Sequence, residues 1–524
     1  MNVFSDHARS VSKETRRIER CCFLLNCNRW WFAAIVFGLI RFAIVVVDYP
    51  SLEADPDAYR AIAEGWSSTG TMGRLLNEGM VSATAYRPPV YPWLLSWVVI
   101  NGKLWLPAVA CFHVLLGVLT CLLASDLSSR LSPRRELQEA GKRSTSNVRK
   151  NAKAHDPRDQ LIGISRHGEE PELVSSSGLA TLRAATSYWL VGLGVALDPI
   201  LLRQSCLIMT ETVATFLTVL IWWIWVTGVR NTSCFQIKQA FIVGLMLGVN
   251  CLIRPTMLVW SLLWIVALLI YYFKYCHRST NSEIRDSFSR SSILAIVLGI
   301  AIILTPWAIR NRVVLGSTIW TTTHGGYTLL LANNPILFRH LELEGFSREW
   351  DEERFHSLWS MRSEADPRSI GFWNGTASMA RSIPTPSSEG IDDQLANETA
   401  WATIASSPST FFKASVARIL WLWALSPSHG QVSKSISILI GVWYATLFML
   451  VAYGIWRGFI RWISKSSSPK SMLLWIPVIS LFVGLTGIHA VYWSNMRMRA
   501  PMMPMMLVIA ATATSCCRKD ATQC

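Results

Sequence analysis

The sequence lacks the motifs with which proteins bind nucleotides, since it contains neither a glycine-rich phosphate loop nor a Walker motif. Such loops supply the backbone N–H groups that hold phosphates. Their absence argues against an ATP-driven pump and against a soluble enzyme that uses a nucleotide sugar. The twelve cysteines are scattered and form no spaced quartet of metal-ligand type. We also find no internal repeat.

Charged residues are scarce as well, at 16% of the 524 residues against about 25% in ordinary soluble domains. The deficit comes from long uncharged runs such as 292–309 and 436–453. Each run is close to the ~20 residues with which a helix crosses a ~30 Å hydrocarbon core. The sequence therefore predicts an all-α polytopic membrane protein. We expect about ten transmembrane helices, near 30–48, 107–126, 180–197, 208–229, 239–254, 256–274, 291–310, 436–456, 471–491 and 501–516.

The net charge of +15 does not point to nucleic acid, because the basic residues gather in particular loops. They lie in the N-terminal tail, in 130–183, in 274–290, in 457–470 and at the C-terminus, whereas the first loop between spans is acidic. Positive charge marks the cytoplasmic side of membrane proteins. We therefore predict cytoplasmic termini, an uncleaved first span and an extracytoplasmic first loop.

These boundaries divide the chain into five parts. Two segments between the spans differ in character: 131–179 is polar and basic, which predicts disorder, whereas 311–435 is rich in tryptophan, which predicts a small packed cap of mixed secondary structure. The predicted parts are a basic tail at 1–29, an N-terminal bundle at 30–310 with the first loop at 49–106 and the insertion at 131–179, the extracytoplasmic cap at 311–435, C-terminal helices at 436–516 and a tail at 517–524.

The first loop reads LEADPDAYRAIAEGWSSTGTMGRLLNEGMVSATAYRPPVYPW from Leu52 to Trp93. Its order of D-x-x-x-Y, a turn of small residues at 67–70 and R-P-P-x-Y-P resembles the first outer loop of the GT-C membrane glycosyltransferases. Within that superfamily it is similar to the bacterial branch related to the dolichyl-phosphate-mannose protein mannosyltransferases and the lipid A aminoarabinose transferase. The sequences P-W-x-x-R-N and R-x-R-x-P-x-x-P further along are similar to elements of the same transferases.

This resemblance implies an inverting sugar transferase at the outer face of a bacterial inner membrane. The donor would be a polyprenyl-phosphate-linked sugar, and the acceptor an envelope lipid, glycan or protein. The motif requires no cofactor and is compatible with a divalent metal. The alternatives are a transporter or flippase of lipid-linked sugars, which would favour inverted repeats and charges at mid-membrane, and a scaffold without activity.

Three carboxylates are candidates for the chemistry. Asp55 occupies the acid of D-x-x-x-Y and is the first candidate for the general base, with Asp57 two residues away as the second. Glu211, at the outer start of a span, is costly there and therefore a functional candidate; Asp198 on the same rim is its alternative. The alternative for Glu211 is a structural role, in which its negative charge stabilises the N-terminus of the helix.

Cations recur at the outer ends of spans, where positive charge is disfavoured. Arginine can form two parallel hydrogen bonds with a phosphate, so we interpret these cations as candidates for holding the lipid phosphate. The alternative is that they are interfacial anchors. Met498 stands where related proteins often have tyrosine. The first loop adds Tyr59 and Arg87 to the substrate-binding candidates, and Arg41 is a costly charge within the first span without a clear role. The candidates near span ends are Arg254, Arg310, Asn311, Arg312, Arg497 and Arg499.

Overall fold

The computed structural model describes residues 30–75, 81–131, 185–231, 236–277, 288–363, 365–376, 388–428, 432–463 and 469–514. The predicted tails at 1–29 and 517–524 lie outside these residues, and so does the predicted insertion 131–179 apart from Leu131.

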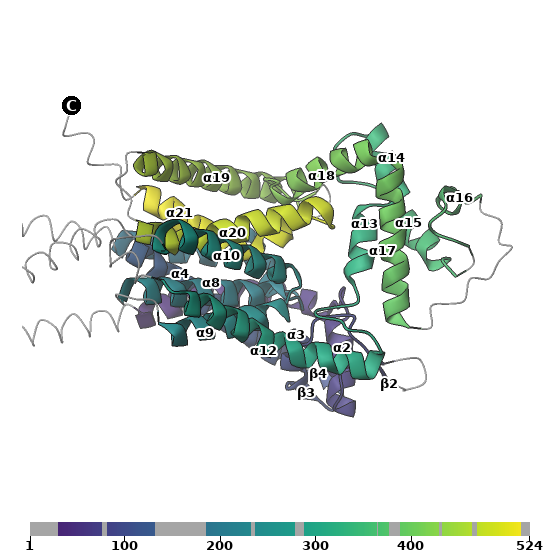
Figure 1. The fold of residues 1–524 in the computed structure, drawn as a ribbon, viewed down its shortest axis with the longest axis horizontal. Coiled ribbons are helices and arrows are strands. Elements are labelled where there is room, and N and C mark those ends of the chain that lie inside the picture. The colour runs from purple at the N-terminus through teal and green to yellow at the C-terminus, as the bar shows by residue number, and fades with distance from the viewer. Residues whose placement is uncertain are drawn as a thin grey trace, which may run out of the picture.

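The described chain is mainly helical, and its long helices run side by side in one bundle (Figure 1). Their apolar side chains form a continuous buried core, which includes Trp222, Trp225 and Trp260. The helices of the bundle are Trp30–Val47, α4 (Leu106–Leu131), Ala185–Leu197, α7 (Pro199–Ser205), α8 (Glu211–Asn231), α9 (Ile237–Cys251), α10 (Thr256–Tyr271) with its π-helical end η2 (Tyr272–Cys276), α12 (Arg290–Leu315), α19 (Lys434–Ile463), α20 (Pro469–Val491), the 3-10 helix η3 (Met496–Met502) and α21 (Met503–Thr514).

The polytopic helical fold is confirmed, whereas the count of ten spans is not. Among the described residues, seven helices are long and apolar enough to cross a membrane. An eighth would be Ala185–Leu197 with α7, which are bent by 54° at Asp198. Two predicted spans are shorter: α9 has 15 residues and the described part of α21 has 12.

Two details explain how the bundle packs. Gly244 lies so close to α12 that a Cβ there would sit 2.3 Å from the carbonyl oxygen of Ile296, so only glycine permits this approach. Pro477 within α20 has no N–H to give the carbonyl of Leu473. The indole N–H of Trp225 donates to that carbonyl instead, at 2.8 Å. The carbonyl that Pro477 leaves without a helical partner is thus satisfied within the bundle, as a membrane requires.

The first loop forms a compact layer at one end of the bundle (Figure 1). The stretch 89–100, which is apolar enough to raise the question of a span, contains only a seven-residue helix and one strand of a hairpin. Trp93, Trp97 and Trp105 are exposed around it. The elements of the loop are the 3-10 helix η1 (Tyr49–Glu53), α2 (Tyr59–Thr69), the antiparallel pair β1 (Gly73–Leu75) and β2 (Val81–Ala83), α3 (Val90–Ser96), and the pair β3 (Val99–Ile100) and β4 (Lys103–Leu104).

The cap lies at the same end of the bundle as the first loop (Figure 1). It has a hydrophobic core of its own, built mainly from aromatic and leucine side chains such as Trp350, Phe355 and Trp373. Between 316 and 428 its described residues form helices and connecting segments without strands. Its helices are α13 (Gly325–Ala332), α14 (Pro335–Leu343), α15 (Glu352–Ser360), α16 (Ile370–Trp373), α17 (Glu389–Ser406) and α18 (Pro408–Leu422).

Candidate functional site

Five charged side chains meet where the first loop covers the bundle. Glu211 begins α8, Arg254 follows α9, Arg497 lies in η3, and Asp57 and Arg87 come from the first loop. We call these five residues the ion cluster. Its ion pairs join Arg87 Nη2 to Asp57 Oδ1 (2.9 Å), Arg497 Nη2 to Asp57 Oδ2 (3.9 Å), Arg497 Nε to Glu211 Oε1 (3.6 Å) and Arg254 Nη1 to Glu211 Oε1 (3.3 Å).

The inner half of the ion cluster is buried. The side chains of Glu211 and Arg254 are 3% and 7% exposed, whereas that of Arg497 is 31% exposed. A buried carboxylate is tolerated only with a partner, and the N-terminus of α8 adds a favourable partial charge. The ion cluster holds three guanidinium groups but only two carboxylates. It therefore carries an excess of positive charge.

Several N–H groups of the ion cluster lack an oxygen acceptor among the described residues. Arg497 Nη1 lies 2.9 Å from the sulfur of Met209, and Arg254 Nη2 contacts the sulfur of Met498. Arg497 Nε and Arg254 Nη1 face Glu211 Oε1 at 3.6 Å and 3.3 Å, but neither contact has the geometry of a hydrogen bond, and neither nitrogen has another acceptor in the described part of the chain. A thioether is a weak acceptor. The two arginines can therefore give stronger hydrogen bonds to an additional anion.

The first loop fixes the outer half of the ion cluster. Arg87 Nε donates to the backbone oxygen of Asp57 at 2.8 Å, and its guanidinium lies 5.5 Å from the ring centre of Tyr59 and 4.8 Å from that of Tyr86. Burial raises the pKa of Tyr59 to about 12, although the nearby Arg87 acts in the opposite direction. Tyr59 is thus a neutral hydroxyl, and its ring positions a charged guanidinium.

Asp55 lies beside the ion cluster but is held differently. Its two carboxylate oxygens accept the backbone N–H groups of Arg60 (3.1 Å) and Ala61 (3.0 Å) at the start of α2. The intervening Ala58 has φ of 60°, a left-handed conformation that costs a non-glycine residue about 1–2 kcal/mol. Among the described residues Asp55 forms no ion pair. Because an ionised carboxylate can accept about four hydrogen bonds, it keeps acceptor capacity while its orientation is fixed.

Arg310 and Asn311 are not brought into the ion cluster. Arg310 donates to the backbone oxygens of Thr84 (3.0 Å) and Met72 (2.8 Å), which lie in the first loop. The amide of Asn311 donates to Ile319 O at 2.9 Å. These two residues tie α12 to the segments around the site.

Arg499 is also placed apart from the ion cluster. Its side chain is fully buried, donates to the carbonyls of Leu422 and Ala424, and lies 4.4 Å from the ring centre of Tyr444. Asp198, the alternative acid, caps α7 and accepts the hydroxyl of Tyr444 at 3.2 Å. Arg499 therefore joins η3 to α19 and to the end of the cap helix α18, and Asp198 joins α7 to α19.

Sequence reasoning did not find Glu389, the first residue of α17. Its carboxylate accepts the hydroxyl of Thr84 at 2.6 Å and the backbone N–H of Ala85. Ala85 O in turn accepts the N–H of Thr323 at 2.9 Å. The cap thus clamps the backbone two residues before Arg87. No local pattern in the sequence marks Glu389 as different from the other acids of the cap.

Glu389→Ala should loosen the clamp. Thr84 and Ala85 are buried, so the loss of their acceptor should lower the free energy of unfolding by about 1–3 kcal/mol. Hydrogen–deuterium exchange should become faster in 84–87. Glu398→Ala removes a carboxylate from the same helix, where it bonds the exposed Gln394 and Arg368, and should leave the exchange of 84–87 unchanged. Equal exchange in the two variants would contradict the clamp.

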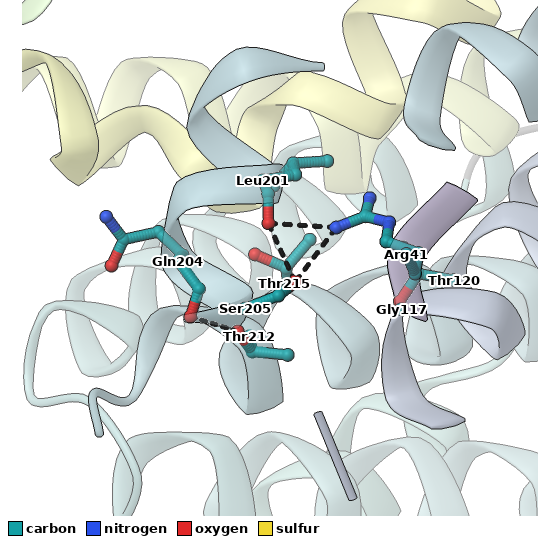
Figure 2. Close-up of a pocket in the computed structure, with 8 residues that line it drawn as sticks. All are labelled: Arg41, Gly117, Thr120, Leu201, Gln204, Ser205, Thr212 and Thr215. Carbon is teal, nitrogen blue, oxygen red and sulfur yellow. Dashed lines mark hydrogen bonds between the residues drawn. The ribbon is translucent and has the colours of Figure 1, made fainter. Parts of the chain in front are cut away.

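A second polar site surrounds Arg41 within the bundle (Figure 2). The buried guanidinium donates to the carbonyls of Leu201 (2.8 Å) and Val195 (2.6 Å) and to the hydroxyl of Ser205 (3.0 Å). The cavity beside it measures only about 10 Å³. That is room for about one water molecule. Arg41 therefore joins the first span to α7 and its neighbours, and this cavity is too small for a substrate.

The described residues contain no group of three or more histidine, cysteine or acidic side chains that could hold a metal ion. Asp57 and Glu211 each face arginines instead. His324, a histidine near the first loop, has its pKa lowered to about 3 by burial and by Arg87. It is therefore neutral and packs edge-on against Tyr86.

Comparisons with known proteins find structural likeness only. No protein-family model matches the sequence, and no curated protein matches it. The structure is similar to an oligosaccharyltransferase from Archaeoglobus fulgidus, solved with zinc and sulfate, at 14% identity and a TM-score of 0.45 over 92% of this chain. It is also similar to ArnT from Cupriavidus metallidurans, solved with undecaprenyl phosphate, at 12% identity and a TM-score of 0.35 over 93% of this chain and 77% of ArnT.

Both of these proteins are GT-C glycosyltransferases, the superfamily that the first loop resembles. The chain spans about half (48%) of the length of the oligosaccharyltransferase. At identities of 12% and 14%, the activity of this chain has to be argued from its own residues.

Proposed function

We propose that the protein is an integral membrane glycosyltransferase that transfers a sugar from a polyprenyl-phosphate-linked donor to an envelope lipid, glycan or protein, with inversion. In this proposal the ion cluster faces the outside of a bacterial inner membrane, and both termini are cytoplasmic. One observation carries it: an excess of guanidinium groups, some of whose N–H groups meet only thioethers, lies beside a carboxylate with free acceptor capacity.

The phosphate of the donor would bind to Arg497 and Arg254 in the ion cluster. Arg497 is the most accessible of the three arginines, and its contacts with Glu211 and Asp57 are the longest. An incoming phosphate can therefore take over its N–H groups. Arg254 adds a second charge, and Asp57 and Glu211 hold the guanidinium groups in place. Such fixed charges act most strongly where water is excluded.

Asp55 would act as the general base. Its carboxylate accepts the proton of an acceptor hydroxyl while the hydroxyl oxygen forms a bond to the anomeric carbon of the sugar. The bond between that carbon and the phosphate oxygen breaks, and its electron pair leaves with the phosphate. Attack on the face opposite the phosphate inverts the anomeric centre. The arginines of the ion cluster stabilise the negative charge that the leaving phosphate gains.

Arg497→Ala tests the phosphate role. We expect the KM for the lipid donor to rise by ~10-fold or more, because charge-assisted hydrogen bonds are lost. Arg497→Lys should restore only part of the affinity, since a point charge lacks the bidentate fork. The measurement is sugar transfer from a purified polyprenyl-phosphate donor to a membrane extract, with the protein in lipid nanodiscs.

Lys434→Ala serves as the control, because it removes an exposed charge at the start of α19. Wild-type donor use by Arg497→Ala would remove Arg497 from the site. If the wild-type protein moved the intact donor across a bilayer without cleaving it, the protein would be a flippase and the transferase proposal would be wrong.

A further inference from the structure

The cap contains a second and much larger cavity, which the proposed chemistry does not use. Its volume is about 320 Å³, within the range of roughly 300–1,000 Å³ that small-molecule sites occupy. It lies between α14, α15, α16 and the junction of α17 with α18. Figure 1 places α16 on the side of the cap that faces away from the bundle. The polar and aromatic residues of its lining include Arg339, Glu342, Arg354, Trp373, Asn374 and Ser406.

Two arginines of this lining have guanidinium groups without a partner among the described residues. Neither Arg339 nor Arg354 makes a side-chain hydrogen bond or an ion pair with another described residue, and both are exposed. The one acid of the lining, Glu342, is engaged in part by the hydroxyl of Thr410 at 2.7 Å. The lining thus carries more positive than negative charge, and its two forks suit a carboxylate or a phosphate.

The rest of the lining suits a sugar ring. The apolar part of the wall comes mainly from the exposed Ile370. Trp373 adds only a small exposed part, because it is 2% exposed in the cap core and its indole N–H donates to Pro367 O at 2.7 Å. The lining also contains uncharged polar groups. The amide of Asn374 and the hydroxyl of Ser406 can form hydrogen bonds with sugar hydroxyls. Sugars present both apolar C–H faces and hydroxyl groups, so one mixed wall serves both. A plain anion would need the arginines only.

We propose that this cavity binds an acidic saccharide, a sugar that carries a carboxylate or a phosphate, as part of the acceptor. The inference rests on the proposed transferase function and names its acceptor class: a glycan with an anionic sugar some distance from the hydroxyl that reacts. The cavity lies in the cap, whereas the donor phosphate would bind where the first loop meets the bundle. A site for the far part of the acceptor would hold the glycan while its end reaches Asp55.

The test measures binding by saturation-transfer NMR to the full chain in nanodiscs, without lipid donor and with Arg497→Ala in every protein, so that phosphate binding at the ion cluster is weakened. The probes are glucuronic acid, glucose 1-phosphate, methyl glucoside and inorganic phosphate. We expect both anionic sugars to bind saturably and at least ~10-fold more tightly than either methyl glucoside or inorganic phosphate. Arg339→Gln and Arg354→Gln should each weaken the binding of the anionic sugars by ~10-fold. Lys434→Gln, a charge loss outside the cavity, should leave it unchanged.

Equal binding of methyl glucoside would overturn the acidic part of the proposal, and equal binding of inorganic phosphate would overturn the saccharide part. Unchanged binding in both arginine variants would place the sugar elsewhere. Thermal unfolding of each variant shows that it is folded, which exposed arginines should permit. Failure of the transferase proposal would be seen as absent donor turnover, which this donor-free measurement does not involve.

Discussion

Replacing Asp55 by asparagine should lower the rate of sugar transfer by ~10²-fold or more, because the proton acceptor of the proposed reaction is removed. The side chain keeps its size but has only one oxygen, so one of the two N–H groups at the start of α2 also loses its acceptor. That loss should cost about 1 kcal/mol of stability. Transfer measured at saturating donor separates the two effects, because a folded variant with intact donor binding should still be slow.

Two further variants sharpen this result. Glu53→Gln changes an exposed acid of the same loop, whose side chain has no partner among the described residues, and should be as active as wild type. Asp57→Asn should raise the KM for the donor more than it lowers kcat, because Asp57 orients Arg87 and Arg497. An active Asp55→Asn together with an inactive Asp57→Asn would move the base by two residues.

Breaking the buried pair of Arg254 and Glu211 should have the largest effect on stability. Arg254→Met leaves Glu211 buried with only the longer contact to Arg497. Removal of one partner of a buried ion pair typically costs about 3–5 kcal/mol. Glu211→Gln should be destabilising for the same reason, since Arg254 then remains buried without a counter-charge. The measurement is denaturant unfolding of the protein in mixed micelles.

The double variant, Arg254→Met with Glu211→Gln, should be less destabilised than the sum of the two single variants, because no uncompensated charge remains next to its lost partner. Arg60→Met provides the matched control. It breaks a half-buried pair with Glu64 at 3.1 Å within α2, for which less than about 1 kcal/mol is expected. Similar losses in Arg60→Met and Arg254→Met would contradict the buried-pair interpretation.

The spans could be predicted from sequence because the bilayer imposes a length and a composition on each helix separately. The predicted run at 291–310 corresponds to α12, and that at 208–229 to α8. The run at 239–254 corresponds to α9, which ends at Cys251, three residues before the predicted end. Hydropathy measures apolar content and cannot say where a short helix stops.

The partners of the charged residues could not be predicted in the same way. An arginine can donate to a carbonyl, a carboxylate or a phosphate, so its type alone does not distinguish Arg310, which holds loop carbonyls, from Arg497, which meets acids and a thioether. The contact between Glu389 and Thr84 joins residues far apart in the chain. Such contacts depend on how the cap packs on the first loop, for which no periodic signal exists.

The residues of the ion cluster are synthesised at different times, because they lie far apart in the sequence. Asp57 and Arg87 are synthesised first, and Glu211 and Arg254 follow with α8 and α9. These four residues balance one another, so the N-terminal helices can settle in the membrane as a neutral set, as domains generally form from the N-terminus onward during synthesis. Arg497 arrives only near the end of translation. The excess positive charge of the ion cluster, and with it the proposed affinity for an anion, is therefore complete only after the last helices have joined the bundle.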